Sequence, residues 1–190
     1  MRVDPIAPAD AMCALRGALP LRTERLLLRT LRPDDLEAVR GYRNAPGQRR
    51  WTYTPDQTEA ELMAWTAGGA PVILRDGDAV QLGIEHDGAL VGDLMVRITS
   101  LRSRQAELGW MIAPDAQGKG IATEAARAAL ELAWGMGAHR VIAHLDEENV
   151  ASRRVAERLG MVVEARHVED EVNPATGELG TSLILAIRRP

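Results

Sequence analysis

A glycine-containing run between a strand pattern and an alanine-rich helix pattern constrains this fold more than any other segment. Residues 105–112 read as a strand, Pro114 ends it, and the run 117–122 carries Gly118 and Gly120, which permit a tight turn. A helix N-terminus after such a turn offers unpaired N–H groups, so the sequence predicts an anion site suited to a diphosphate. The helix repeats every 3.6 residues and predicts a buried stripe of Ala122, Ala126, Ala129, Leu130, Ala133 and Trp134.

Other interpretations of this loop fit less well. A Walker-type phosphate loop needs Ser or Thr after its lysine, whereas Gly120 follows Lys119 here, and Pro114 stands in place of the first glycine. A G-x-G-x-x-G dinucleotide fingerprint fits the two glycines, and Asp146 follows at about the expected distance, but Thr123 replaces the third glycine. A plain glycine turn that binds nothing stays open on the loop alone.

The remaining patterns predict a mixed α/β (α+β) sheet with helices on its faces and no regular βαβ alternation. The predicted order is β-αα-βββ-α-β-α-ββ. Asp87-Gly88 predicts a two-residue hairpin turn, and Asn149 and Gly160 fit the two caps of a late helix. The predicted strands are 25–31, 80–86, 90–99, 105–112, 140–145, 161–168 and 179–187, and the predicted helices follow Pro33 or cover 58–66, 122–134 and 150–159.

Composition narrows the function classes. The chain has 190 residues and a net charge of −4 without a basic block, which does not predict a nucleic-acid binder. Its apolar runs stay far below the roughly 20 residues of a membrane span. Cys13 is the single cysteine and the histidines lack metal-ligand spacing, so neither a disulfide nor a metal site is expected.

Domain organisation is predicted to be simple. Asp4, Pro5, Pro8 and Asp10 interrupt what would be the apolar core of a signal peptide, so we expect a cytoplasmic protein. We expect residues 1–20 to form a flexible N-terminal arm and residues 21–190 to form a single domain.

Ordered motifs along most of the chain resemble the GNAT N-acetyltransferase superfamily. The run Q-G-K-G-I-A at 117–122 is similar to that family's pyrophosphate loop, Q/R-x-x-G-x-G/A. The segments T-E-R-L-L-L-R at 23–29 and P-D-D at 33–35 look like the opening of the RimJ/RimL-like branch, the ribosomal-protein N-terminal acetyltransferases. Residues 106–110 resemble the fourth strand of this branch, with Trp110 where tyrosine is common. Residues 149–153 and 157–161 resemble its late helix, with Met161 where phenylalanine is usual.

This resemblance implies the GNAT acyl-CoA N-acyltransferase fold, with acetyl-CoA bound where the fourth and fifth strands part. It implies that backbone groups of Trp110, Met111 and Ile112 pair with the pantetheine arm. Asn149 would bond the pantetheine amides, and it fits a simple N-cap equally well. The diphosphate would be held by backbone N–H groups, with the Lys119 ammonium as a helper, along the run Gln117, Gly118, Lys119, Gly120, Ile121, Ala122 and Thr123.

Two side chains are candidates for the chemistry of acyl transfer. Ser152 stands where the family aims a hydroxyl or phenol at the CoA sulfur, so we expect it to hydrogen-bond or protonate the leaving thiolate; a small packing residue is the alternative. Glu107 shares a strand face with Gly109 and Met111 and is the candidate base for the amine, the alternative being a structural ion pair with an arginine.

The sequence therefore predicts transfer of an acetyl group from acetyl-CoA to a primary amine, a protein N-terminal α-amine or a small molecule, by direct attack. Transfer of another acyl group such as succinyl, and a non-catalytic acyl-CoA-binding regulatory module, stay open. Trp51 and Tyr53 are candidates to line the acceptor pocket. The expected partners are the acyl-CoA and the amine, with neither nucleic acid nor membrane, and pairing of two copies through the last strands stays open.

Overall fold

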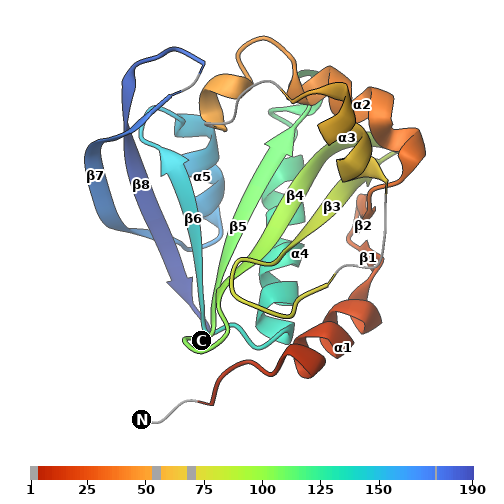
Figure 1. The fold of residues 1–190 in the computed structure, drawn as a ribbon, viewed down its shortest axis with the longest axis vertical. Helices are drawn as coiled ribbons and strands as arrows, with labels where there is room; N and C mark the ends of the chain where they lie inside the picture. The colour runs from red at the N-terminus through yellow and green to blue at the C-terminus, as the bar shows by residue number, and fades with distance from the viewer. Residues whose placement is uncertain (1–3, 53–56, 68–71, 174) are drawn as a thin grey trace.

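The strands form one mixed sheet, which Figure 1 shows with helices on both faces. The computed structural model describes residues 4–52, 57–67, 72–173 and 175–190. Within them the sheet order is β1-β2-β3-β4-β5-β6-β8-β7, and every neighbouring pair is antiparallel except β5 with β6. The strands are β1 (Leu21–Arg22), β2 (Leu26–Thr30), β3 (Ala79–His86), β4 (Ala89–Ser100), β5 (Gln105–Ile112), β6 (Arg140–Asp146), β7 (Val162–Val172) and β8 (Leu179–Arg188).

The helices divide between the two faces of the sheet. In Figure 1, α2 and α3 cover one face near the end of β5, α4 and α5 lie on the opposite face, and α1 and the C-terminus lie at the other end of the strands. No helix in the described part of the chain combines the length and hydrophobicity that crossing a bilayer requires. The helices are α1 (Pro8–Ala18), α2 (Leu36–Arg43), α3 (Glu59–Thr66), α4 (Ile121–Gly135) and α5 (Val150–Arg158), with 3₁₀ turns at Pro33–Asp35, Arg49–Trp51 and Pro114–Ala116.

The predicted mixed α/β class and the predicted order of elements are confirmed from β2 onward. Strand ends differ most in β7, which extends to Val172 rather than ending near Val168. The cause is an irregularity between His167 and Glu171, where Glu169 has a positive φ of 50°, after which β7 resumes pairing with β8. Periodicity ends at such a bulge, so the sequence pattern missed the continuation.

Local backbone angles and short-range hydrogen bonds set the ends of several elements. Asp87 and Gly88 both have positive φ, 51° and 78°, as a two-residue hairpin turn between β3 and β4 requires. Thr58 caps α3 by accepting a hydrogen bond from Glu61 N, and the Glu61 carboxylate returns to Thr58 N at 2.7 Å. These local interactions set where α3 begins and where the chain turns between β3 and β4.

The N-terminal residues differ from the expected flexible arm. Residues 8–18 form α1, whose Ala11 and Leu15 are fully buried and whose Met12 is nearly so. The helix packs against α4, and Ile6 N donates to Leu101 O at 2.9 Å. The proline that interrupted a signal-peptide pattern instead begins this helix, because proline at the first helical position loses no hydrogen bond.

Side chains of β5 alternate between two cores, which places the strand at the centre of the molecule. Ala106, Leu108 and Ile112 belong to the large core beneath α4, whereas Met111 belongs to a smaller core beneath α2 and α3. The second core contains Leu31, Val39, Tyr42 and Leu62. Each face of β5 is therefore fixed by a different pair of helices.

Truncation of the buried stripe of α1 tests whether this helix is part of the folded domain. Leu15→Ala should lower the free energy of unfolding by about 3 kcal/mol, because it leaves a cavity between α1 and α4. The exposed neighbour Arg16→Ala should change it by no more than about 0.5 kcal/mol. Urea unfolding followed by circular dichroism measures both. If both substitutions changed the free energy of unfolding by the same small amount, residues 8–18 would be a flexible arm and not part of the folded domain.

Candidate active site

The parallel strands β5 and β6 part after three residue pairs. Gln105, Ala106 and Glu107 pair with Arg140, Val141 and Ile142, but β5 continues to Ile112 and β6 to Asp146 without further pairing between them. Backbone groups along the parted segments lose their ladder partners. Because such groups seek hydrogen bonds, the opening suits an extended ligand that can take the place of a strand.

The direction of the backbone groups in β5 decides which residues face this opening. Ala113 N donates to Val91 O at 2.9 Å across the β4–β5 pair, and N–H and C=O groups alternate sides along a strand. Met111 therefore directs its backbone groups to β4, whereas Trp110 and Ile112 direct theirs to the β6 side. The carbonyl of Ile112 already accepts bonds from Gln117 Nε2 at 2.9 Å and Gln48 Nε2 at 2.7 Å. Of the three predicted backbone contacts, two face the gap.

The loop after β5 forms a concave run of backbone N–H groups. Gly118 and Gly120 adopt φ of 75° and 79°, which L-residues with a side chain rarely adopt. Gly120 is the N-cap of α4 and contributes no side-chain cap. Within the described residues, no N–H from Gly118 to Thr123 donates a hydrogen bond. Six consecutive free donors at the positive end of a 15-residue helix have the geometry and polarity that suit an anion.

An orphaned hydroxyl and a cleft adjoin these donors. Thr123 Oγ1 is buried and has no hydrogen-bond partner among the described residues, which leaves a polar atom that a ligand can satisfy. Thr123 lines a cleft of about 720 Å³ together with both loop glycines. Arg127, one helical turn further along α4, and Arg158 of α5 also line it. The predicted loop therefore lies at a cleft that these two arginines share with the carboxylates of Glu24, Glu124 and Glu131.

The late helix places Asn149 and Ser152 beside the parted strands. Asn149 is buried and its Oδ1 accepts from Ser152 N at 3.1 Å, which confirms the predicted N-cap. That bond uses the amide oxygen and leaves the Nδ2 donors available. The half-buried Ser152 hydroxyl has no partner in the described parts of the chain.

Glu107 occupies the opposite side of the sheet from α4. Its side chain, 18% exposed, lies on the α2 and α3 face and accepts from Arg97 Nη1 of β4 at 3.4 Å. The structure therefore contains the arginine pair that the sequence left as an alternative. This long contact between partly exposed groups holds the carboxylate weakly, so it does not by itself fix a structural role.

A buried carboxylate fastens α2 and α3 to the sheet on this second face. Asp93 of β4 is 1% exposed and accepts from Tyr42 Oη at 2.6 Å, Arg43 Nη2 at 2.8 Å and Gln81 Nε2 at 2.5 Å. The Arg43 guanidinium also stacks on the Trp65 ring at 3.4 Å. Burial and the neighbouring Asp93 charge raise the pKa of Tyr42, which stays protonated and donates. This cluster holds the two helices over the end of β5.

A smaller, acidic cleft opens where β6 ends. Its volume is about 210 Å³, and it lies between the β6–α5 connection, the β7–β8 hairpin and the 3₁₀ turn at Arg49–Trp51. Arg50, which pairs with Glu148, is its one lining cation among the described residues. Of the two aromatic residues predicted near an acceptor, Trp51 is half-buried in this turn, and Tyr53 lies outside the described residues. The lining carboxylates are those of Asp146, Glu147, Glu148, Glu169 and Glu178.

Comparison with known proteins decides the family. A profile of the acetyltransferase (GNAT) domain matches residues 25–162, which include both parted strands and the glycine loop. The chain belongs to the GNAT acetyltransferase family. The acetyltransferase is 33% identical over 149 residues to the uncharacterized N-acetyltransferase YnaD of Bacillus subtilis, with 74% of this chain and 81% of that protein covered.

Solved structures agree with this assignment. A GNAT-family acetyltransferase from Bacillus anthracis is 26% identical with a TM-score of 0.76, covering 88% of this chain and 96% of its own. Mycobacterium smegmatis RimJ, solved in complex with CoA-disulfide, is 25% identical with a TM-score of 0.70, covering 86% of this chain and 81% of its own. These likenesses confirm the resemblance to the GNAT family and its RimJ/RimL-like branch, and the chain is an acyltransferase enzyme.

Sequence patterns did not indicate three arginines that lie near the glycine loop. Arg127 follows Thr123 by four residues and lies on the same helix face, so helical periodicity could have located it. Arg158 reaches the cleft from α5, and Arg25 reaches the loop from the β1–β2 turn, where its Nη1 donates to Lys119 O at 3.1 Å. No sequence signal joins residues 25 and 119, because only the tertiary fold brings them together.

Proposed function

We propose that this acetyltransferase moves an acetyl group from acetyl-CoA to a primary amine by direct attack within a ternary complex. The observation that carries the proposal is the run of six unpaired N–H groups from Gly118 to Thr123 beside the parted strands. A diphosphate supplies several acceptor oxygens and negative charge at one place, which matches donors at a helix N-terminus. The orphaned Thr123 hydroxyl adds a seventh donor in the same cleft.

The residues present fit the other parts of the cosubstrate as well. We assign the pantetheine amides to the backbone groups of Trp110, to the N–H of Ile112, whose carbonyl is already bonded, and to the free Nδ2 of Asn149. Met111 contributes through its side chain and its pairing with β4 rather than through free backbone groups. Arg127 and Arg158 line the same cleft, and we assign the additional phosphate of CoA to these two guanidinium groups.

For this reaction the protein mainly has to position the thioester and the amine and to provide groups that accept and donate protons. The amine nitrogen forms a bond to the acyl carbon, the carbon–sulfur bond breaks, and the sulfur leaves as a thiolate that takes up a proton. In the proposal the Ser152 hydroxyl hydrogen-bonds this sulfur, and Glu107 accepts the proton that the amine loses. The exposed Cys13 lies on α1, which packs near the opposite end of the strands, so the proposal has no acyl-cysteine step.

The acceptor decides how much basic help is needed. At pH 7 roughly 10–17% of an α-amino group is neutral, against about 0.04% of a lysine side chain. A protein N-terminal amine or another weakly basic amine therefore needs little assistance, and an ion-paired carboxylate such as Glu107 suffices. A lysine acceptor would depend more on a general base, because a far smaller share of it is neutral. We therefore place α-amines and weakly basic amines first.

The acidic cleft at the end of β6 bears on the identity of the acyl group. Five carboxylates and one arginine line it, and the arginine is already paired with Glu148. In the proposal the acyl end points toward this cleft, where an acyl group with its own carboxylate, such as succinyl, would meet like charge, whereas acetyl carries none. This favours acetyl over succinyl, in keeping with the acetyltransferase family.

Release of the CoA thiol from acetyl-CoA with a panel of amines and N-terminal peptides tests the function. Turnover with at least one amine is expected, with succinyl-CoA used at least about tenfold less well if like-charge repulsion operates. Tight acetyl-CoA binding without turnover for every amine would favour the second candidate, a non-catalytic acyl-CoA-binding module. The intact Glu107, Ser152 and loop support the enzyme instead.

Removal of the serine hydroxyl tests its place at the sulfur. Ser152→Ala should lower kcat by about 10- to 100-fold while the Kd for acetyl-CoA changes little, because the hydroxyl acts mainly as the thiolate forms. Steady-state kinetics and calorimetric titration measure the two quantities, with the exposed Ser103→Ala as the matched control. An unchanged kcat would remove Ser152 from the mechanism.

Thr123 and Lys119 separate a site made of the helix N-terminus from one made of a lysine. Thr123→Val should leave the free energy of unfolding unchanged or raised, since it removes an unsatisfied buried hydroxyl, yet weaken CoA binding about tenfold. The exposed Lys119→Ala should weaken binding by less than about fivefold. Thermal unfolding and calorimetric titration provide the readouts. The opposite ranking would shift the site to the lysine ammonium.

A further inference from the structure

A polar clamp joins the β1–β2 turn to the glycine loop and the first turn of α4. Glu124 Oε1 accepts from Thr23 Oγ1 at 2.6 Å and from Arg25 N at 3.0 Å, while Glu124 Oε2 lies 2.7 Å from both Arg25 Nε and Arg25 Nη2. Arg25 Nη1 then donates to Lys119 O at 3.1 Å. One guanidinium thus holds both a carboxylate of α4 and a carbonyl of the loop.

The charge of Glu124 gives the clamp a consequence for an anionic ligand. Glu124 lines the same cleft as Gly118, Gly120 and Thr123, one residue beyond the six free N–H groups. Burial opposes its ionisation, but the hydrogen bonds from Thr23 and Arg25 outweigh burial and lower the pKa of Glu124, so the carboxylate is charged at neutral pH. Without a partner, this charge would repel a diphosphate; the Arg25 guanidinium neutralises it through the ion pair with Glu124.

The bond to Lys119 O sets the orientation of the loop itself. The carbonyl of Lys119 and the N–H of Gly120 belong to one planar trans peptide and point in opposite directions. Arg25 therefore turns the Gly120 N–H away from itself. Gly120 has a φ of 79°, and a Cβ there would lie 3.5 Å from Arg25 Nη2, so the guanidinium packs directly against the loop. A glycine loop without this contact can rotate the peptide and lose one donor.

We propose that Arg25 is a positioning residue for the diphosphate of CoA, acting through Glu124 and the Lys119 carbonyl rather than by touching the reacting atoms. This inference rests on the proposed function, since it names a residue that tunes the same loop. Arg25 serves the phosphate-bearing part of the donor and not the thioester. Its loss therefore affects donors with a diphosphate and spares those without one.

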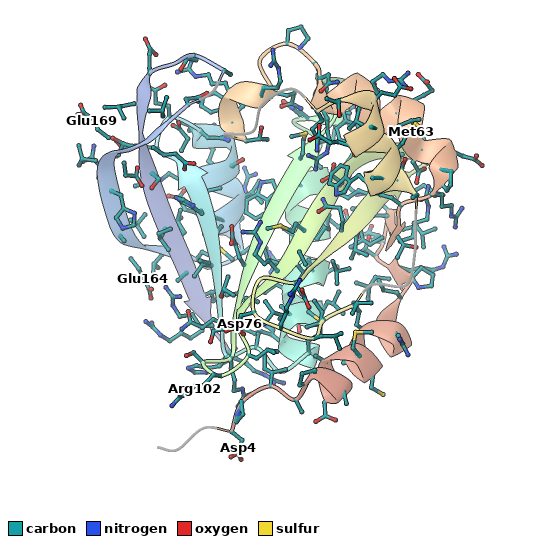
Figure 2. All side chains as sticks on the ribbon, viewed as in Figure 1. Asp4, Met63, Asp76, Arg102, Glu164 and Glu169 are labelled. Carbon is teal, nitrogen blue, oxygen red and sulfur yellow. The ribbon has the colours of Figure 1, made fainter. Side chains whose placement is uncertain are left out.

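The test compares two thioester donors, acetyl-CoA and S-acetylpantetheine, which lacks the diphosphate. Arg25→Ala should raise KM for acetyl-CoA and Kd for CoA about tenfold with kcat within about twofold, because a charge-assisted contact is lost and a carboxylate is exposed. The kcat/KM for S-acetylpantetheine should be unchanged. Arg102→Ala is the matched control: Arg102 is exposed and lies near the C-terminus, on the far end of the sheet from α2 and α3 (Figure 2).

Two further variants keep the proposal falsifiable if Arg25→Ala folds poorly. Arg25→Lys retains the charge but not the two-way fork, so it should fall between wild type and Arg25→Ala. In Arg25→Ala/Glu124→Gln the exposed charge is gone, and CoA affinity should recover at least about threefold over Arg25→Ala. Absence of recovery would overturn the neutralising role of Arg25.

The outcomes distinguish this inference from the proposed function. If wild type binds CoA and Arg25→Ala binds it equally well, the positioning role is overturned while the CoA site stands. If Arg25→Ala loses both donors to the same extent, the residue is merely structural, which also overturns the role. If wild type binds no CoA at all, the proposed function itself fails.

Discussion

Unpaired backbone in the middle of a folded sheet is the constraint on which this structure depends. The β5–β6 pair holds for three residue pairs only, and the loop that follows β5 adds six N–H groups without acceptors among the described residues. Such groups are costly to leave without hydrogen bonds. The protein tolerates them because they lie at a cleft, where solvent or a ligand can complete the bonds. The N–H groups that lack partners within the protein are the same groups that we propose bind the ligand.

The two faces of the sheet divide the work around this deficit. The α4 and α5 face supplies the helix N-terminus, Thr123 and the arginines of the larger cleft. The α2 and α3 face carries Glu107. The buried carboxylate of Asp93, 1% exposed, holds α2 to this face by accepting hydrogen bonds from Tyr42 and Arg43. Because Gln48 and Gln117 both donate to the carbonyl of Ile112, the two faces also meet at the last residue of β5. In the proposed function, the acetyl-CoA from one face and the amine from the other meet at the end of this strand.

The sequence was informative where structure is local. The Asp87-Gly88 turn, the Asn149 cap and the Gly118 and Gly120 turn each depend on neighbouring residues, so their patterns predicted these turns and the helix start correctly. Long-range features were not accessible: Arg25 and Glu124 are 99 positions apart and form their pair only in the fold. The helix α1 was missed because its prolines and acids masked a short buried stripe. The direction of the Met111 backbone groups also required the register of β4 against β5.

The central claim is that free backbone N–H groups of β5 and the glycine loop form the CoA site, and exchange of individual amides measured by NMR tests it most directly. On addition of CoA, amides of Ile112 and of residues 118–123 should gain protection from exchange, because each acquires an acceptor. The Met111 and Ala113 amides, directed to β4, should be protected equally with and without CoA. If CoA bound but the amides of Ile112 and residues 118–123 exchanged at unchanged rates, the account would be contradicted.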